Sequence, residues 1–189
     1  MSDDQIDDVL TEAELKMDGA VEHTQASFGK IRTGRANPTL VTDLRVEYYG
    51  AATPLQQLAS VSVPEPRMLL INPFDASSLK EIERSISNAD LGLNPSSDGQ
   101  VIRVVFPELT QDRRKEYVKL ARERAEEGRV SIRNIRRAAK SELSKLSSDG
   151  DAAEDEVQRA EKRLQDLTDS HVARIDGFLS NKESELLEV

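Results

Sequence analysis

Apolar residues recur at intervals of three and four along three long stretches of the chain, and this spacing predicts three amphipathic helices. The helices are expected over residues 2–32, 110–147 and 152–187. At 1.5 Å per residue, helices of about 35 residues are roughly 50 Å long. The polar connection at 147–151 is short, so the second and third helices are expected to be antiparallel neighbours.

The stretch between the first and second helices has a different pattern. Residues 33–106 contain six of the seven prolines, and their apolar residues come in short runs. Short runs bounded by turn residues are typical of strands. Strands are expected over 44–48, 58–63, 68–71 and 101–106. Asp98-Gly99 predicts a hairpin-type turn before the last of them, and residues 96–99 as a whole are interpreted as a turn.

A single short helix also fits this stretch, over residues 77–87. Its apolar residues fall on one face, and Asp75 or Ser77 can cap its first turn. The sequence therefore predicts an α+β protein, a long three-helix bundle with an inserted small β/α/β domain. The bundle is expected to comprise residues 1–31 and 107–189, and the inserted domain residues 32–106.

Two connections join the predicted domains, one at Thr33-Gly34 and the other at Phe106-Pro107. Gly34 permits backbone angles that are closed to other residues, whereas Pro107 fixes its own φ and lacks an N–H donor. Such a pair suits a hinge that bends in only a few directions. Glycine and proline also commonly end helices and begin strands, so the sequence leaves both interpretations open.

Charge is distributed unevenly along the chain. The formal net charge is −9. Residues 113–146, however, carry twelve basic and five acidic side chains, a local charge of +7 that leaves −16 for the remainder. Because salt screens charges beyond roughly 8–10 Å, a basic segment can attract polyanions despite an acidic total.

Five cations of the second predicted helix share one face. At about 100° per residue they fall within an arc of about 60° and span about 27 Å. We call this set the Arg stripe, and it consists of Arg122, Arg129, Arg133, Arg136 and Lys140. Only Glu126 lies beside it as a helical partner, with expected pairs to Arg122 and Arg129, so most of its cations are expected to lack local counter-ions.

The Arg stripe has two interpretations. A run of charge on a helix is most often a solvated face. Four of the five residues, however, are arginines, whose planar guanidinium matches phosphate better than the ammonium of lysine does. Several phosphates along a nucleic-acid backbone would fit within its length. Nucleic-acid binding and a solvated surface therefore remain alternatives.

The composition argues against catalysis, metal binding and membrane insertion. The chain has no cysteine, and its two histidines, His23 and His171, lie at or beside helical seams, where packing is the expected role. No phosphate-binding glycine loop is present, and no apolar run approaches the length of a membrane span. The acidic N-terminus does not resemble a signal peptide. We expect a soluble cytoplasmic protein that is not an enzyme and uses no cofactor.

Several motifs, in this order and spacing, resemble the bacterial ribosome recycling factor family over nearly the whole chain. The motifs are residues 31–38 (IRTGRANP), 72–75 (NPFD), 91–95 (LGLNP), 106–110 (FPELT) and 125–137 (AEEGRVSIRNIRR). The resemblance implies the bundle with an inserted domain and an outline like that of transfer RNA. It further implies binding to the large ribosomal subunit and cooperation with elongation factor G and GTP to separate the ribosomal subunits after termination.

The resemblance also implies particular residue roles. The family's main ribosomal RNA contacts correspond to Arg129, Arg133 and Arg136, and Arg32 and Arg35 near the first connection are lesser candidates. Hydrolysis of GTP would belong to the partner factor, so this chain would be no enzyme. The family resemblance also favours a monomer.

Two other functions are weighed against this one. A helical scaffold or chaperone would grip partners between its helices. It would need an exposed apolar stripe, and its binding would tolerate high salt. A small hydrolase in the inserted domain would need a nucleophile–base pair, which the sequence does not offer. Recycling instead requires an exposed Arg stripe and salt-sensitive binding.

Overall fold

The computed structural model describes residues 2–188, so the predicted domain limits at residues 1 and 189 lie outside the described part. The chain forms two compact units. The helical unit comprises the chain as far as Phe28 together with Val118–Ser184, and the small unit comprises Gly29–Tyr117 together with the chain from Glu185. Long helices and a small β-sheet unit confirm the predicted α+β class.

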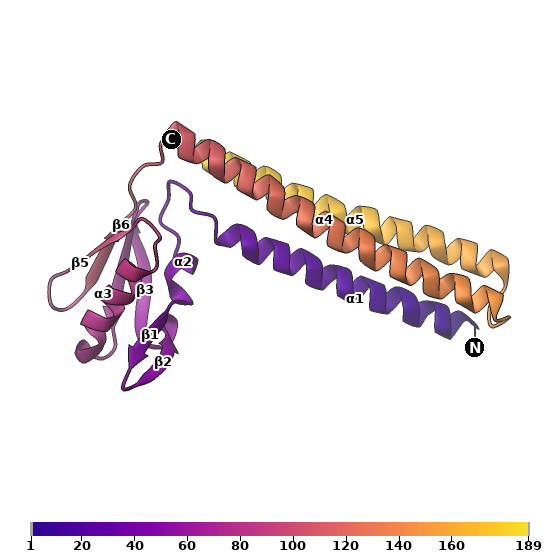
Figure 1. Ribbon diagram of the computed structural model, residues 1–189, viewed down its shortest axis with the longest axis horizontal. Coiled ribbons are helices and arrows are strands. Elements are labelled where there is room, and N and C mark those ends of the chain that lie inside the picture. Colours follow the sequence, from indigo (N-terminus) through magenta and orange to yellow (C-terminus); the bar gives the residue numbers. More distant parts are fainter. Residues whose placement is uncertain (1, 189) are drawn as a thin grey trace. The chain divides into compact units, whose positions relative to one another are not determined.

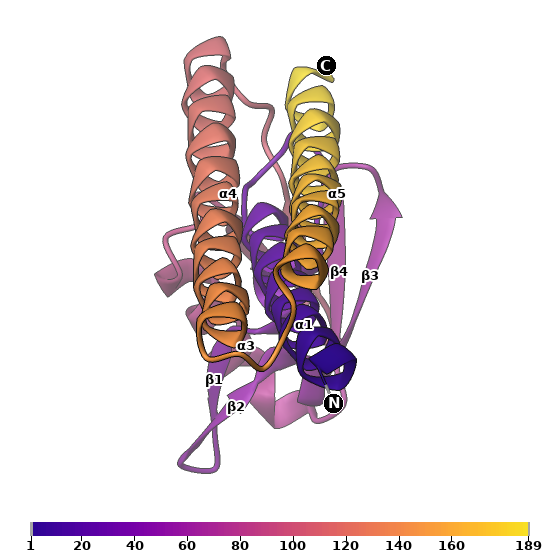
Figure 2. The ribbon, with the colours of Figure 1, turned by 90° about the vertical axis from the view of Figure 1, so that its right-hand side faces the viewer.

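The helical unit is built from α1 (Ser2–Gly29), α4 (Gln111–Ser148) and α5 (Glu154–Leu187), which lie side by side (Figures 1 and 2). All three predicted helices are confirmed, although the first ends three residues earlier than expected. The Asn37 side-chain amide donates to the Gly29 carbonyl over 3.0 Å and so caps this end. The seam between the helices buries mainly Leu10, Met17, Val21, Ala125, Ile132, Leu143, Leu164 and Ile175.

A short turn reverses the chain between α4 and α5. The N–H groups of Asp151 and Ala152 both donate to the Leu146 carbonyl, over 2.9 and 3.0 Å. Gly150 takes a φ of +81°, the left-handed conformation that commonly ends helices. The prediction that these helices are antiparallel neighbours is confirmed (Figure 1).

Gly128 marks the tightest approach within the helical unit. A Cβ atom at this position would lie 2.3 Å from Thr24 Oγ1 of α1 and 2.9 Å from Ile175 Cδ1 of α5. Thr24 and Ile175 are both buried, and the Thr24 hydroxyl donates to the Ala20 carbonyl over 2.8 Å. The absence of a side chain at Gly128 therefore allows α1 and α5 to approach α4 at this level.

The small unit contains two antiparallel sheets. A hairpin pairs β1 (Arg45–Tyr48) with β2 (Ala51–Pro54). The larger sheet has the strand order β3-β4-β6-β5. Its strands are β3 (Ala59–Glu65), β4 (Met68–Pro73), β5 (Asn94–Ser97) and β6 (Ile102–Val105). Short helical segments are α2 (Thr39–Thr42), η1 (Leu55–Gln57) and η2 (Ala76–Ser78).

Helix α3 (Leu79–Asn88) covers the core of the small unit and contacts β1 and β5. Asp75 caps η2, the segment that leads into α3, because its carboxylate accepts the Ser77 N–H over 2.9 Å. Asp75 is one of the two caps that the sequence predicted. Tyr48 donates its hydroxyl to the same carboxylate over 2.9 Å. The core buries, among others, Leu69, Ile71, Ile82, Ile86, Ile102, Val104 and Phe106.

Two strands, β2 and β5, and two short helical segments, α2 and η1, escaped the sequence analysis. Strand β5 has the sequence NPSS, and residues 96–97 were expected in a turn, which is wrong because they pair with Arg103 and Ile102 of β6. Strand β5 lies at the edge of the sheet, where Pro95 can be accommodated. Edge strands with so little apolar content give no alternating pattern, so only the neighbouring strand reveals them.

The turn between β5 and β6 contains the predicted Asp98-Gly99 pair. The hydrogen bonds that Asp98 accepts there give its carboxyl group a pKa that can be tested. Its carboxylate accepts the N–H groups of Gln100 and Val101 and a guanidinium N–H of Arg103, each over 3.0 Å. These bonds, chiefly those from the Val101 and Gln100 backbone, lower the pKa of Asp98 from 3.8 to about 2. Because the folded pKa lies below the ordinary value, the carboxylate stabilises the fold above about pH 4.

That stabilisation is expected to disappear as the pH falls from about 4 to about 2. Carboxyl-detected NMR should show Asp98 titrating near 2, and Asp98→Asn should flatten the fall in stability across this range. The exposed Asp43 serves as the control position, at which asparagine should change little. A titration midpoint of Asp98 near 3.8 would contradict the assigned turn.

Candidate nucleic-acid interface

The Arg stripe lies along the edge of α4 that faces α5. Arg122, Arg129 and Arg136 are seven residues apart, and this spacing returns to nearly the same face of a helix. Because α5 runs antiparallel to α4, its acidic residues meet the stripe in reverse order. The stripe therefore borders the contact between two long helices of the same compact unit.

Three of the five stripe cations form ion pairs with carboxylates of α5. Arg122 Nε lies 2.7 Å from Glu183, Arg129 Nη2 lies 2.7 Å from Asp176, and Lys140 Nζ lies 3.0 Å from Glu161. Only Arg129 and Arg133 pair with a carboxylate among the described residues of α4, as the expected lack of local counter-ions requires. That expectation considered the one helix alone, so it missed the partners that the neighbouring helix supplies.

Glu126 is the partner that the sequence did predict on α4 itself. It pairs with Arg133 over 2.6 Å and with Arg129 over 3.1 Å. The hydrogen bond from Arg133, followed by that from Arg129, lowers the pKa of Glu126. The expected pair with Arg122 does not form, because Arg122 reaches Glu183 instead.

The stripe residues differ in how firmly they are held. Arg129 bonds Asp176 and Glu126 together, and its side chain is only 22% exposed. Arg133 has one carboxylate partner and is 42% exposed. Arg136 donates to the neutral amide oxygen of Gln165 over 3.3 Å. Arg136, held among the described residues by a neutral amide alone, can therefore reach a new anion with the smallest loss of existing contacts.

Three carboxylates of this surface, Glu161, Asp176 and Glu183, were missed by the sequence analysis. A signal was available, because the three fall within an arc of about 60° on the third predicted helix. Once the two helices are taken as antiparallel neighbours, such an arc beside a basic arc indicates cross-helix ion pairs. We call these three residues the α5 carboxylate row.

Arg32 and Arg35 lie in the small unit, apart from the stripe in the chain. Arg32 donates to the Pro107 carbonyl over 2.8 Å, and its guanidinium carbon lies 6.0 Å from the centre of the Phe106 ring. Its Nε is buried without a partner among the described residues. Arg35 is 70% exposed and pairs with Glu188 over 2.9 Å. Arg32 thus ties the two connections together, whereas Arg35 remains accessible.

The predicted hinge residues occupy different environments. Thr33 is buried, and its hydroxyl accepts the Arg35 N–H over 3.3 Å. Gly34 does not have a positive φ, and a Cβ atom at this position would have no neighbour within 4 Å. Phe106 is fully buried in the core of the small unit, and its N–H donates to the Arg67 carbonyl over 2.7 Å. Phe106 is therefore anchored in the core of the small unit, directly before Pro107.

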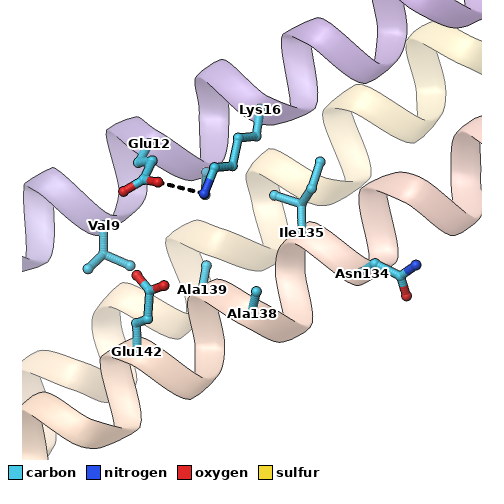
Figure 3. Close-up of a pocket in the computed structure, with 9 residues that line it drawn as sticks. Val9, Glu12, Lys16, Asn134, Ile135, Ala138, Ala139 and Glu142 are labelled. Carbon is cyan, nitrogen blue, oxygen red and sulfur yellow. Dashed lines mark ion pairs between the residues drawn. The ribbon is translucent and has the colours of Figure 1, made fainter.

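A hollow between α1 and α4 bears on the scaffold alternative (Figure 3). It has a volume of about 310 Å³ and a largely apolar floor that includes Ala13, Ala138 and Ala139. Glu12 and Lys16 of α1 form an ion pair at its margin (Figure 3). The hollow is short and bordered by charge, unlike the continuous apolar stripe that a scaffold would need.

The histidines fit the packing role that was expected of them only in part. His171 is buried, with Nδ1 2.6 Å from the Leu167 carbonyl and Nε2 2.9 Å from Asp18, whereas His23 is exposed. Within residues 2–188, no cluster of three potential metal ligands is found. None of the described helices has the length and apolar composition to cross a membrane.

Sequence comparison relates the chain to one family of known proteins. The family model described as ribosome recycling factor matches residues 24–187. Ribosome-recycling factors of Renibacterium salmoninarum and Kineococcus radiotolerans are 59% and 56% identical over 184 residues, which cover 97% of this chain and all of theirs.

Solved structures extend the similarity to the fold. A solution structure of a ribosome recycling factor matches with a TM-score of 0.81 and 40% identity, covering 98% of both chains. A second structure depicts the T. thermophilus ribosome recycling factor and the E. coli elongation factor G bound to the E. coli post-termination complex. It matches with a TM-score of 0.69 and 44% identity, covering 97% of this chain and 99% of that one. A family match across most of the chain, relatives identical at more than half of the aligned positions and a shared fold lead to one conclusion: this protein belongs to the ribosome recycling factor family.

Proposed function

We propose that this protein binds the post-termination ribosome and, with elongation factor G and GTP, promotes its separation into subunits. The observation that carries the proposal is the Arg stripe along the edge of α4 that faces α5, in a chain of this family. The post-termination complex bound by the T. thermophilus relative supports the same partners. We further propose that the protein acts as a cytoplasmic monomer.

The stripe is the proposed anchor on ribosomal RNA of the large subunit. Exposed ion pairs contribute only about 0–1 kcal/mol each, so phosphates can replace the carboxylates at little cost in stability. Arg136 would engage first, because a neutral amide holds it, and the neighbouring Arg133 would follow by leaving Glu126. Arg122, Arg129 and Lys140 would extend the contact along the helix, and the accessible Arg35 would add to it from the small unit. Arg32, engaged within the small unit, would act mainly through the connection that it ties together.

The proposed division of labour leaves no chemical step to this chain. The bundle, proposed as residues 1–31 and 107–189, holds the RNA, and the inserted domain of residues 32–106 meets elongation factor G. Movement would occur at Thr33-Gly34 and in the backbone that leads from Phe106 into Pro107. GTP is hydrolysed by the partner factor, so the protein works as a stiff, charged lever and is not an enzyme.

The test is binding to large ribosomal subunits across a salt series, with Arg133→Ala/Arg136→Ala as the variant. At about 100 mM salt we expect affinity to fall by about 10–100-fold, because two phosphate contacts are lost. The slope of log affinity against log salt should become shallower by about 2. Filter binding or sedimentation measures both quantities.

A matched control is Arg159→Ala/Arg163→Ala. It removes the same charge from cations of α5 that pair with Asp155 and Asp7 instead of bordering the stripe. Circular dichroism should show both variants folded, and the control should bind like the wild type. Equal binding by the stripe variant and the control would refute the stripe as the anchor. Failure of the wild type to bind would refute the recycling function.

A further inference from the structure

Each stripe cation that contacts α5 already holds an acceptor oxygen where an RNA phosphate would have to bind. Asp176 Oδ1 lies within hydrogen-bonding distance of both Nε and Nη2 of Arg129, at 2.8 and 2.7 Å. Glu183 Oε1 accepts a hydrogen bond from Arg122 Nε over 2.7 Å. These nitrogens belong to the guanidinium fork with which arginine binds phosphate. The carboxylates therefore stand in for the phosphate oxygens while the protein is free.

The contacts between α4 and α5 repeat in register along the two helices. Residue 122 faces residue 183 and residue 129 faces residue 176, while residue 136 faces residue 165 and residue 140 faces residue 161. Three of these four positions on α5 carry a carboxylate, and the fourth is the neutral Gln165. The one break in the α5 carboxylate row thus lies opposite Arg136, and the neighbouring Arg133 pairs with Glu126 of α4 and with no carboxylate of the row.

We propose that the α5 carboxylate row competes with RNA for the Arg stripe and thereby sets its selectivity. This inference rests on the proposed function, because it requires the stripe to be the RNA-binding surface. An incoming backbone must displace Glu161, Asp176 and Glu183 from their cations and then lie close to three unpaired negative charges. Arg133 and Arg136 offer an open entry point, and the full contact forms only on an RNA that holds several phosphates in place along the stripe.

This competition acts most strongly on non-cognate RNA. Binding without shape or sequence recognition depends almost wholly on phosphate contacts, so repulsion from the row removes most of its affinity. A cognate site adds contacts that do not involve the row and is weakened less. An acidic row beside a basic stripe would then keep a phosphate-binding protein from being retained on other cellular RNA.

A purely structural role of the row makes a different prediction. If the ion pairs only hold α4 against α5, removal of the carboxylates would leave RNA affinity unchanged, or lower it because the stripe side chains become less ordered. Side chains in the row are 29–52% exposed, where solvent weakens such bracing. RNA affinity, rather than stability, therefore separates the two roles.

The experiment uses Asp176→Asn/Glu183→Gln in the full chain. The amide oxygens still accept hydrogen bonds from Arg129 and Arg122, so the stripe keeps its shape while two negative charges are lost. The probes are an RNA hairpin unrelated to ribosomal RNA and purified large subunits. At about 50 mM salt we expect about tenfold tighter binding to the hairpin, with a smaller gain on subunits.

The control is Glu14→Gln/Asp166→Asn, which makes the same charge change on the α1–α5 side, where both residues line another hollow. Charges there are screened from the stripe, so hairpin affinity should stay near that of the wild type. Equal hairpin affinity in the two variants, or an equal gain on hairpin and subunits, would overturn the inference. If Arg133→Ala/Arg136→Ala binds subunits as the wild type does, the proposed function itself fails.

Discussion

Phe106→Ala is expected to unfold the small unit at a much lower denaturant concentration while the helical unit stays folded. Phe106 is fully buried and belongs to the hydrophobic core of the small unit. Removing a buried phenylalanine ring leaves a cavity and costs about 3–5 kcal/mol. That is a large share of the stability of a small domain, typically about 5–15 kcal/mol. The helical unit has its own buried seam and does not share this core.

The chain supplies separate probes for the two units. There is no tryptophan, and two of the three tyrosines, Tyr48 and Tyr49, lie inside the small unit, whereas Tyr117 lies on α4 at its boundary. Tyrosine fluorescence therefore follows mainly the unfolding of the small unit. Circular dichroism at 222 nm follows mainly the long helices. In urea the fluorescence transition should shift and the dichroism transition should stay. The neighbouring Val105, 53% exposed, is the control, and alanine there should change little. Coincident shifts of both signals after Phe106→Ala would contradict independent units.

Gly128→Ala and Gly177→Ala are expected to change the stability of the helical unit in opposite directions. Alanine normally favours a helix over glycine by about 1 kcal/mol. At Gly177 on α5 a Cβ would have no neighbour within 4 Å, so the full gain is expected. At Gly128 the Cβ would overlap Thr24 and Ile175. Overpacking of this kind costs about 1–3 kcal/mol, so a net loss is expected there.

The expected difference between the two variants is about 2–3 kcal/mol, measured by urea unfolding followed at 222 nm. Combining Gly128→Ala with Thr24→Ala removes the nearest clash and should restore much of the loss. A Gly128→Ala variant as stable as Gly177→Ala would mean that α1 and α5 can move apart from α4 at no cost. The close packing described for Gly128 would then be wrong.

The helical part of the fold was largely predictable because a long helix repeats its signal over many turns. Ile6, Leu10 and Met17 on α1, or Ile132 and Leu143 on α4, are buried as the spacing indicated. The ends were less certain, since a single side-chain cap such as Asn37 decides where α1 stops. Sequence periodicity carries no information about such a distant cap.

The candidate surface was predictable only in its basic half. Helical spacing placed the five cations on one face, but it says nothing about which residues the next helix brings opposite them. Asp176 and Glu183 are 47 and 61 residues from their partners Arg129 and Arg122 in the chain. Only the antiparallel register of α4 and α5 joins them, and that register depends on the packing of both helices. Strands β2 and β5 were missed for the same reason, because their partners define them.

The order of elements along the chain has a consequence for synthesis. Helix α1 leaves the translating ribosome first, but its bundle partners α4 and α5 follow only after the whole small unit. All core residues of the small unit lie between Leu40 and Phe106, so that unit can fold while α5 is still untranslated. At roughly 5–20 residues per second, the apolar face of α1 stays uncovered for many seconds. A factor that acts on ribosomes at the end of translation thus completes its own bundle only as its last helix is made.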